Sequence, residues 1–180
     1  CNGWTCTDVL PSLNAAPENH GMGGAFADFD GDGRLDLYQA DLGVSQAWFQ
    51  LPDGQLEDRA TRLGLTPWTH GTSAWTPMAG DFNGDGWIDL YVANTVRAAG
   101  AADLARLVLS EPPAEPMPPQ VDYLLENHGG RFVVREVPHQ GPSYGITWGV
   151  VRGADYDGDG RLDVAVTRLT ELQVLRNETR

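Results

Sequence analysis

The 180-residue sequence contains no lysine: its 12 basic residues are all arginine, against 25 Asp and Glu, for a formal net charge of -13. The absence of lysine excludes a Schiff-base lysine and the phosphate-binding lysine of a P-loop. The acidic balance excludes nucleic acid as a partner, because its phosphates need a positive face. No apolar run approaches the roughly 20 residues that cross a bilayer, so no transmembrane segment is expected.

Cysteine is almost as scarce, with Cys1 and Cys6 as the two examples. Two such close cysteines, in a chain rich in Gly and Asp, are typical of a secreted protein with one small disulfide. A cysteine in first place is also typical of a mature bacterial lipoprotein with a lipid anchor there, and this alternative competes for Cys1. Both interpretations predict an extracellular, periplasmic or outer cell surface location. No signal peptide is visible, but a cleaved one would leave no trace.

What the sequence does have is a repeat. Residues 28–36, 81–89 and 155–163 align without gaps and hold 11 of the 25 acidic residues. Each segment is followed by alternating apolar residues that predict a short strand, and further strands with Gly-containing turns follow. The pattern predicts an all-β fold of three propeller-type blades, a partial propeller, with repeats at about 4–55, 56–131 and 132–180.

The second repeat is longer than the first, and residues 97–120 account for the difference. Leu104, Leu107 and Val108 share one helical face, which predicts a short surface helix. Five prolines between residues 112 and 119 end any helix and predict an extended Pro-rich link.

The two ends of the sequence fall at the same point of the repeat. Gly3 aligns with the turn glycines Gly54 and Gly130, and the last residues after Asn177 stop where that turn comes next. An N-terminal strand is therefore expected to complete the sheet of the last strand, as in closed propellers. Propellers have about four to eight blades, so three blades are expected to contact further blades of the same polypeptide or other protein chains.

The repeated loop has the pattern Asp-x-(Asp/Asn)-x-Asp-Gly-x-x-Asp, which predicts a Ca²⁺ site because Ca²⁺ takes six to eight oxygen ligands in a flexible shell. Side chains at positions 1, 3, 5 and 9 and the backbone carbonyl at position 7 are the predicted ligands. They are Asp28, Asp30, Asp32, Arg34 and Asp36; Asp81, Asn83, Asp85, Trp87 and Asp89; and Asp155, Asp157, Asp159, Arg161 and Asp163. Without a cation the carboxylates would repel one another. About three Ca²⁺ ions are expected, with the second loop weaker because Asn83 lowers its charge.

An EF-hand is excluded by the residues after the loop. It needs a glutamate at position 12 and flanking helices, whereas position 12 here is Gln39, Val92 or Val166 within a strand pattern.

The loop motif, preceded by Gly24-Ala-Phe-Ala27, resembles the FG-GAP/VCBS repeats that build the calcium-binding β-propellers of integrin α subunits. With Leu124-Leu125-Glu126-Asn127 and Leu175-Arg176-Asn177-Glu178, it is most similar to bacterial secreted proteins of the VCBS and ASPIC/UnbV type, related to cartilage acidic protein. The resemblance implies four-stranded blades with calcium in a hairpin loop of each blade. Family rings usually have six to eight blades, and this chain departs from that number.

The resemblance implies a non-enzymatic extracellular scaffold for protein contacts or adhesion. The alternative is a carbohydrate-binding module, or an accessory domain of a carbohydrate-active enzyme; Trp68, beside Pro67, is the candidate for stacking on glycans. The segment around Ser143 fits G-x-S-x-G but lacks the strand and helix that a hydrolase nucleophile needs, so no enzyme is expected.

Overall fold

The computed structural model describes residues 5–15, 20–65, 73–95, 121–138, 151–168 and 172–179. Apart from the short 3-10 helix η1 (Leu10–Ser12), the regular elements of these residues are strands in three antiparallel sheets. Blade 1 has β1 (Gly21–Ala27), β2 (Asp36–Asp41), β3 (Gln46–Gln50) and β4 (Leu56–Asp58); blade 2 has β5 (Ser73–Gly80), β6 (Asp89–Thr95), β7 (Val121–Asn127) and β8 (Phe132–Pro138); blade 3 has β9 (Val151–Ala154), β10 (Asp163–Thr167) and β11 (Leu172–Leu175).

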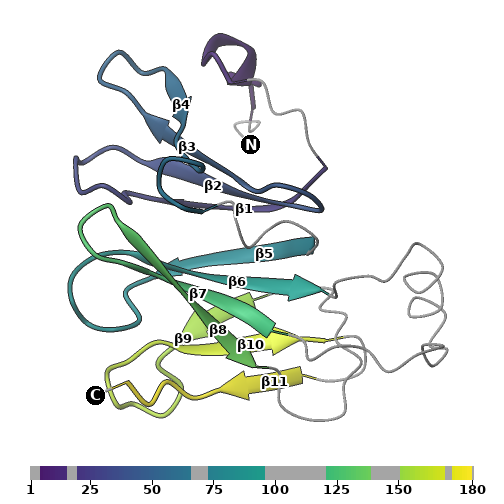
Figure 1. Ribbon diagram of the computed structural model, residues 1–180, viewed down its shortest axis with the longest axis vertical. Helices are drawn as coiled ribbons and strands as arrows, with labels where there is room; N and C mark the ends of the chain where they lie inside the picture. The colour runs from purple at the N-terminus through teal and green to yellow at the C-terminus, as the bar shows by residue number, and fades with distance from the viewer. Residues whose placement is uncertain are drawn as a thin grey trace, which may run out of the picture.

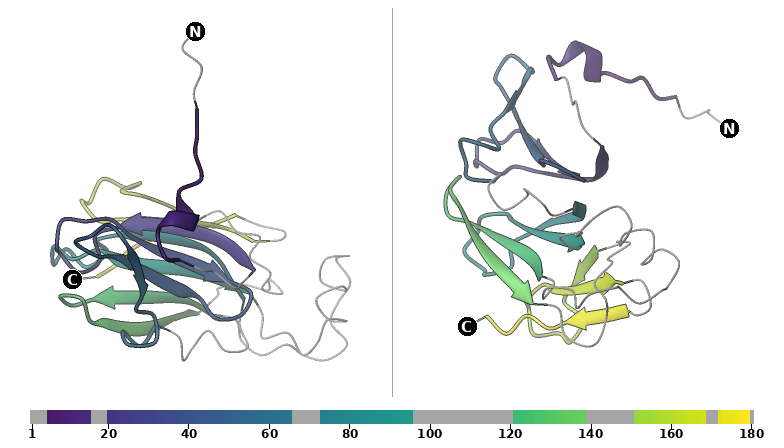
Figure 2. Two further views of the ribbon diagram at one scale, coloured as in Figure 1. Left: turned by 90° about the horizontal axis from the view of Figure 1, so that it is seen from above. Right: turned by 45° about the vertical axis from the view of Figure 1, so that its right-hand side comes forward.

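The three sheets lie side by side like blades of a propeller, with the first strand of each blade next to the first strand of the following one (Figures 1 and 2). This confirms the predicted all-β, propeller-type fold, and the sheets do not close into a ring. The expected sharing of a sheet between the two ends of the chain involves Gly3, which lies outside the described residues, so it stays a prediction. The segment around η1 lies on blade 1, where the Leu56 N–H donates to the Leu13 carbonyl at 3.0 Å.

The alternation of side chains along the second strand explains how the blades stack. Leu90 and Val92 of β6 are buried in the cluster shared with blade 1, whereas Tyr91 and Ala93 are buried in the cluster shared with blade 3. Successive side chains of a strand point to opposite faces of the sheet, so a strand with an apolar residue at every position buries both of its faces. Blade 2 is therefore a middle layer with two apolar faces.

Seam 1, the contact between blades 1 and 2, is an apolar interface rich in aromatic rings. Phe29, only 1% exposed, lies at its centre, with its ring centroid 6.4 Å from that of Phe49 and 6.1 Å from that of Phe132. Tyr38, Leu90 and Leu125 are completely buried beside them.

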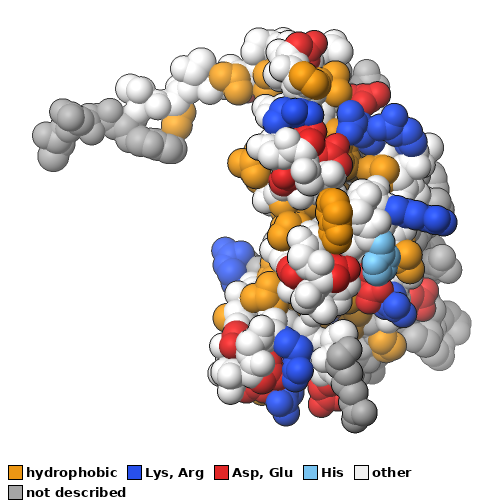
Figure 3. Space-filling view, turned by 90° about the vertical axis from the view of Figure 1, so that its left-hand side faces the viewer, with side chains coloured by type: hydrophobic (Ala, Val, Ile, Leu, Met, Phe, Trp, Pro, Cys, Tyr) orange, Lys and Arg blue, Asp and Glu red, His pale blue; other side chains and the backbone are white. Residues whose placement is uncertain are grey.

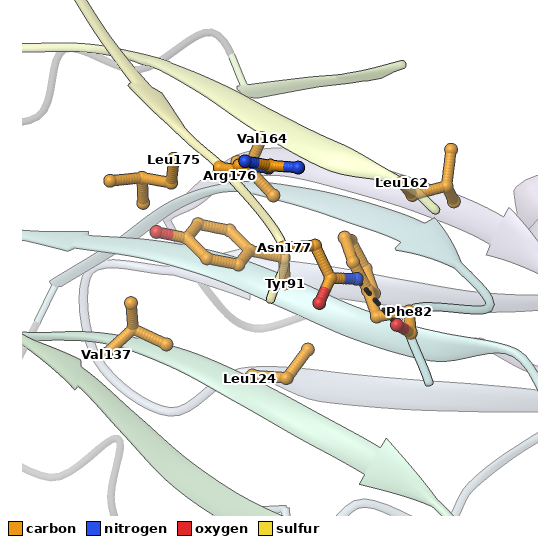
Figure 4. Close-up of a pocket in the computed structure, with 9 residues that line it drawn as sticks. All are labelled: Phe82, Tyr91, Leu124, Val137, Leu162, Val164, Leu175, Arg176 and Asn177. Atoms are coloured by element: carbon orange, nitrogen blue, oxygen red, sulfur yellow. Dashed lines mark hydrogen bonds between the residues drawn. The ribbon is translucent and has the colours of Figure 1, made fainter. Parts of the chain in front are cut away.

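Seam 2, the contact between blades 2 and 3, is smaller and partly ionic. Phe82 and Tyr91 pack there against Val164, around a cavity of about 110 Å³ (Figure 4). Next to the cavity the buried Arg168 guanidinium lies 3.1 Å from the Asp122 carboxylate, which also accepts the Tyr91 O–H at 2.7 Å. Seam 2 is thus held by a charge pair as well as by apolar contacts.

Several sequence expectations concern residues outside the described ones: the helical insertion at 97–120, the stacking residue Trp68 and the segment around Ser143. Cys6 is described, exposed and free, so the predicted disulfide is not seen. Cys1 lies outside the described residues, and its lipid anchor stays a prediction.

Candidate metal loops

The three predicted loops are the hairpins that connect the first and second strands of each blade. All three lie at the same end of the blades, on the left in Figure 1, and acidic side chains gather there in three places (Figure 3). The fold therefore presents the three motifs as three separate and equivalent hairpins along one face.

The aspartate at position 1 of each loop shapes the backbone. Asp28 accepts the N–H groups of Gly31, Asp32 and Gly33 at 2.8, 3.1 and 2.8 Å, and Asp81 and Asp155 accept the corresponding three N–H groups of their own loops. The last donor in each set is a glycine with φ between 85° and 88°, a region that a Cβ disfavours. This explains why the motif needs Gly at position 6.

The aspartate at position 9 is buried in all three loops and ties the hairpin to the third strand of its blade. Asp36 is 0% exposed and accepts the N–H groups of Phe29 at 2.9 Å and Gln50 at 3.0 Å. Asp89 and Asp163 accept equivalent pairs of N–H groups. Burial raises the pKa of Asp36 to about 6, because the loss of water outweighs the two hydrogen bonds, and burial likewise raises the pKa of Asp89.

Carboxylate oxygens converge in the first and third loops. One oxygen from each of Asp28, Asp30 and Asp36 lies within 4.8 Å of the other two, and Asp155, Asp157 and Asp159 form the same kind of group. Within the described part of the chain, Asp30 Oδ1 is buried without a hydrogen-bond partner. Burial, followed by the neighbouring Asp32, raises the pKa of Asp30. The loops thus contain oxygen ligands at close range whose charge is only partly compensated.

Arginine side chains compensate part of the negative charge of these carboxylates, a role that the sequence had not indicated for them. Arg34 and Arg161, predicted as backbone ligands at position 7, turn their side chains to the carboxylates at position 5, Asp32 and Asp159. Two further arginines come from outside the loops and reach position 3: Arg59 lies 3.0 Å from Asp30, and Arg176 lies 2.7 Å from Asp157. The motif of the acidic loop includes neither of these two residues.

The second loop differs at positions 3 and 7. Asn83 donates to Asp85 at 3.0 Å, and among the described residues this loop does not form a group of three converging acidic side chains. Trp87 covers Gly31 of the first loop so closely that a Cβ at Gly31 would lie 2.8 Å from the indole ring. The second loop therefore has fewer charged ligands and a side chain that contacts its neighbour.

Side-chain amides connect the first and second loops to the next blade. The Asn127 Nδ2 donates to the Phe29 carbonyl in the first loop at 2.8 Å, and the Asn177 Nδ2 donates to the Phe82 carbonyl in the second loop at 2.7 Å (Figure 4). We call this contact the amide clasp. Sequence reasoning had noted both asparagines as part of the repeat without finding their role, and their recurrence after the third strand was the available signal.

Fold and loops together define a β-propeller-type module made of repeated blades. Residues 28–92, from the first loop into β6, match the model of the FG-GAP-like repeat family. This match supports an FG-GAP-like repeat protein and indicates a β-propeller-type interaction domain. No curated protein matches the chain. Among the residues that the structure describes, no helix is long and apolar enough to cross a membrane.

Proposed function

We propose that the chain is an extracellular, calcium-stabilised module that mediates protein–protein contacts or adhesion and performs no catalysis of its own. The interaction role follows from the repeat class and the open stack of blades.

The single observation that carries the calcium proposal is the convergence of Asp28, Asp30 and Asp36. Three acidic side chains whose oxygens lie within 4.8 Å of one another repel when ionised, which is an energetic cost to the fold. Burial and the repulsion between neighbouring carboxylates both raise the pKa values of Asp30 and Asp36. A bound divalent cation removes the cost and also satisfies the buried Asp30 Oδ1. The donor set fits the ion: these are hard oxygen ligands, which Ca²⁺ accepts in flexible shells, whereas Mg²⁺ requires near-ideal octahedral geometry.

The extracellular location is proposed for a related reason. Extracellular calcium modules bind the ion with dissociation constants of roughly 10⁻⁴ to 10⁻³ M, so partly exposed loops with arginine-compensated carboxylates are adequate there. The strong acidic charge favours a calcium-rich environment that screens the carboxylates.

Thermal unfolding with and without calcium tests the proposal. We expect the melting temperature to rise with Ca²⁺ and to fall after chelation, because an ion that binds only the folded chain stabilises it. Asp157→Asn should reduce that rise by weakening calcium binding in the third loop, because it places there the asparagine that the second loop has at position 3. The control is Asp53→Asn, in the β3–β4 turn, where the carboxylate accepts the Gln55 N–H at 3.0 Å and no cluster is present. An identical response of both variants would contradict the assignment.

A further inference from the structure

The two seams follow one recurring rule with three components. Position 8 of a loop supplies an aliphatic side chain that packs toward the preceding blade: Ile88 packs on the cluster of seam 1, and Leu162 packs on that of seam 2. The receiving blade has a small residue just before its loop, and a Cβ at Gly80 would lie 2.6 Å from Leu162 Cδ1. Ala27, at the same place in blade 1, is buried in seam 1.

The second and third components are the loop aromatic and the amide clasp. Phe29 and Phe82, at position 2 of their loops, are 1% and 5% exposed because the next blade covers them. Their carbonyls accept the side-chain amides of Asn127 and Asn177. Each seam therefore joins an aliphatic side chain and an amide on one blade to a small residue, an aromatic ring and a carbonyl on the other.

The outer face of blade 1 carries the first half of this contact. Leu35, at position 8, is 61% exposed, and Phe26 beside it is 69% exposed. Gln50 is the counterpart of Asn127 and Asn177, since its N–H binds the aspartate at position 9 in the same way, and its side chain is half-buried. These residues are the equivalents of groups that are packed against a neighbouring blade at seams 1 and 2.

The outer face of blade 3 carries the second half. Ala154, just before the loop, is exposed, and Tyr156, at position 2, is 62% exposed where Phe29 and Phe82 are buried. The four loop residues Asp155 to Asp159 that surround Tyr156 are exposed as well. The third loop thus lacks the cover that the first two receive.

We infer that the outer face of blade 3 binds the outer face of blade 1 of a second copy of this chain. A second copy is the partner because one chain carries both complementary halves of the contact. The same kind of contact already occurs twice within the chain, at seams 1 and 2. The contact sets Leu35 on Ala154 and the Gln50 amide on the Tyr156 carbonyl. In seam 2, Gly153 lies against Met78. At the corresponding place of the contact between copies, the aromatic ring of Phe26 lies against the guanidinium of Arg152.

Such a contact joins two different faces, so two copies that contact each other twice form a closed ring of six blades, within the range of propellers. The inference deepens the proposed interaction role by naming the partner. It does not depend on calcium, which is measured separately, so failure of either proposal is recognised independently of the other.

Sedimentation in calcium-saturated buffer at micromolar concentration tests the inference. We expect the unmodified chain to have at least twice the 19.5 kDa of a single copy. Leu35→Asp and Ala154→Arg should each give 19.5 kDa alone, with far-UV circular dichroism unchanged. Mixing the two variants should restore the larger mass, because one intact contact remains and the other pairs Asp with Arg. The control Val133→Asp changes a 41% exposed residue of β8, away from both faces, and should keep the larger mass.

Three results would overturn the inference. They are a folded, unmodified chain of 19.5 kDa, variants that keep the larger mass, and a mixture that stays at 19.5 kDa. The last result excludes a head-to-tail contact, because mixing the two variants leaves one such contact with both of its residues unmodified.

Discussion

Seams 1 and 2 use the same topology and the same amide clasp, yet they are held together differently. Seam 1 buries a group of aromatic rings around Phe29, and no charge pair between described residues crosses it from one blade to the other, whereas seam 2 has a cavity of about 110 Å³ beside the buried pair of Arg168 and Asp122. The clasp and the loop geometry thus define where one blade meets the next. The side chains that fill the seam vary with the blade.

The largest effect is expected at the aromatic centre of seam 1. Phe29→Ala should lower the free energy of unfolding by about 4 kcal/mol, because it removes a buried ring and leaves a cavity between Phe49 and Phe132. Urea unfolding in saturating calcium measures the change. A loss below about 1 kcal/mol would mean that seam 1 is not the main source of stability.

The ionic part of seam 2 comes next. Arg168→Met should cost about 3 kcal/mol, since it leaves the buried Asp122 carboxylate without its cation. Adding Asp122→Asn to this variant should recover part of the loss, because the remaining amide carries no charge. If the double variant is less stable than Arg168→Met, the pair does not act as described.

The clasps should give a smaller and unequal effect. Asn127→Ala should cost about 2 kcal/mol, because the buried Phe29 carbonyl loses its donor. Asn177→Ala should cost less, since Asn177 is only half-buried and its amide donates to the Phe82 carbonyl, whereas the Asn127 amide donates to both the Phe29 carbonyl and, at 3.1 Å, the Ile88 carbonyl. Equal losses for the two variants would contradict the assigned difference between the seams.

The smallest expected effect is an increase in stability. Val137→Ile adds a methylene to the wall of the seam 2 cavity and should raise the free energy of unfolding by about 0.5 to 1 kcal/mol. Val92→Ile, in the closely packed seam 1, is the matched control and should destabilise the protein by overpacking. Gains from both variants would show that the seams are packed alike.

Much of this arrangement was predictable from the sequence, because loops and strands are local patterns. The spacing of acidic residues located all three hairpins, and short apolar segments such as Leu90 to Val92 located the second strands. The position 9 aspartates were predicted as calcium ligands. Their buried role as acceptors of two N–H groups was not foreseen, since one donor lies on a distant strand.

Contacts between blades could not be predicted in the same way. Asn127 meets Phe29, 98 residues earlier, and Arg168 meets Asp122, 46 residues earlier, with no fixed offset that a repeat pattern reveals. The arginines at the loops are similar, since Arg59 reaches Asp30 only after the chain has folded. The sequence showed that the blades repeat, whereas the structure was needed to show how neighbouring blades are joined.

Isothermal titration calorimetry with Ca²⁺, on protein freed of metal by a chelator, tests the central claim most directly. The account predicts about three ions per chain, with the weakest binding in the second loop, where Asn83 replaces an aspartate. A site held at a calcium concentration 100 times its dissociation constant adds about 2.7 kcal/mol to the free energy of unfolding. A folded chain that gives no binding heat and no calcium-dependent stabilisation would contradict the account.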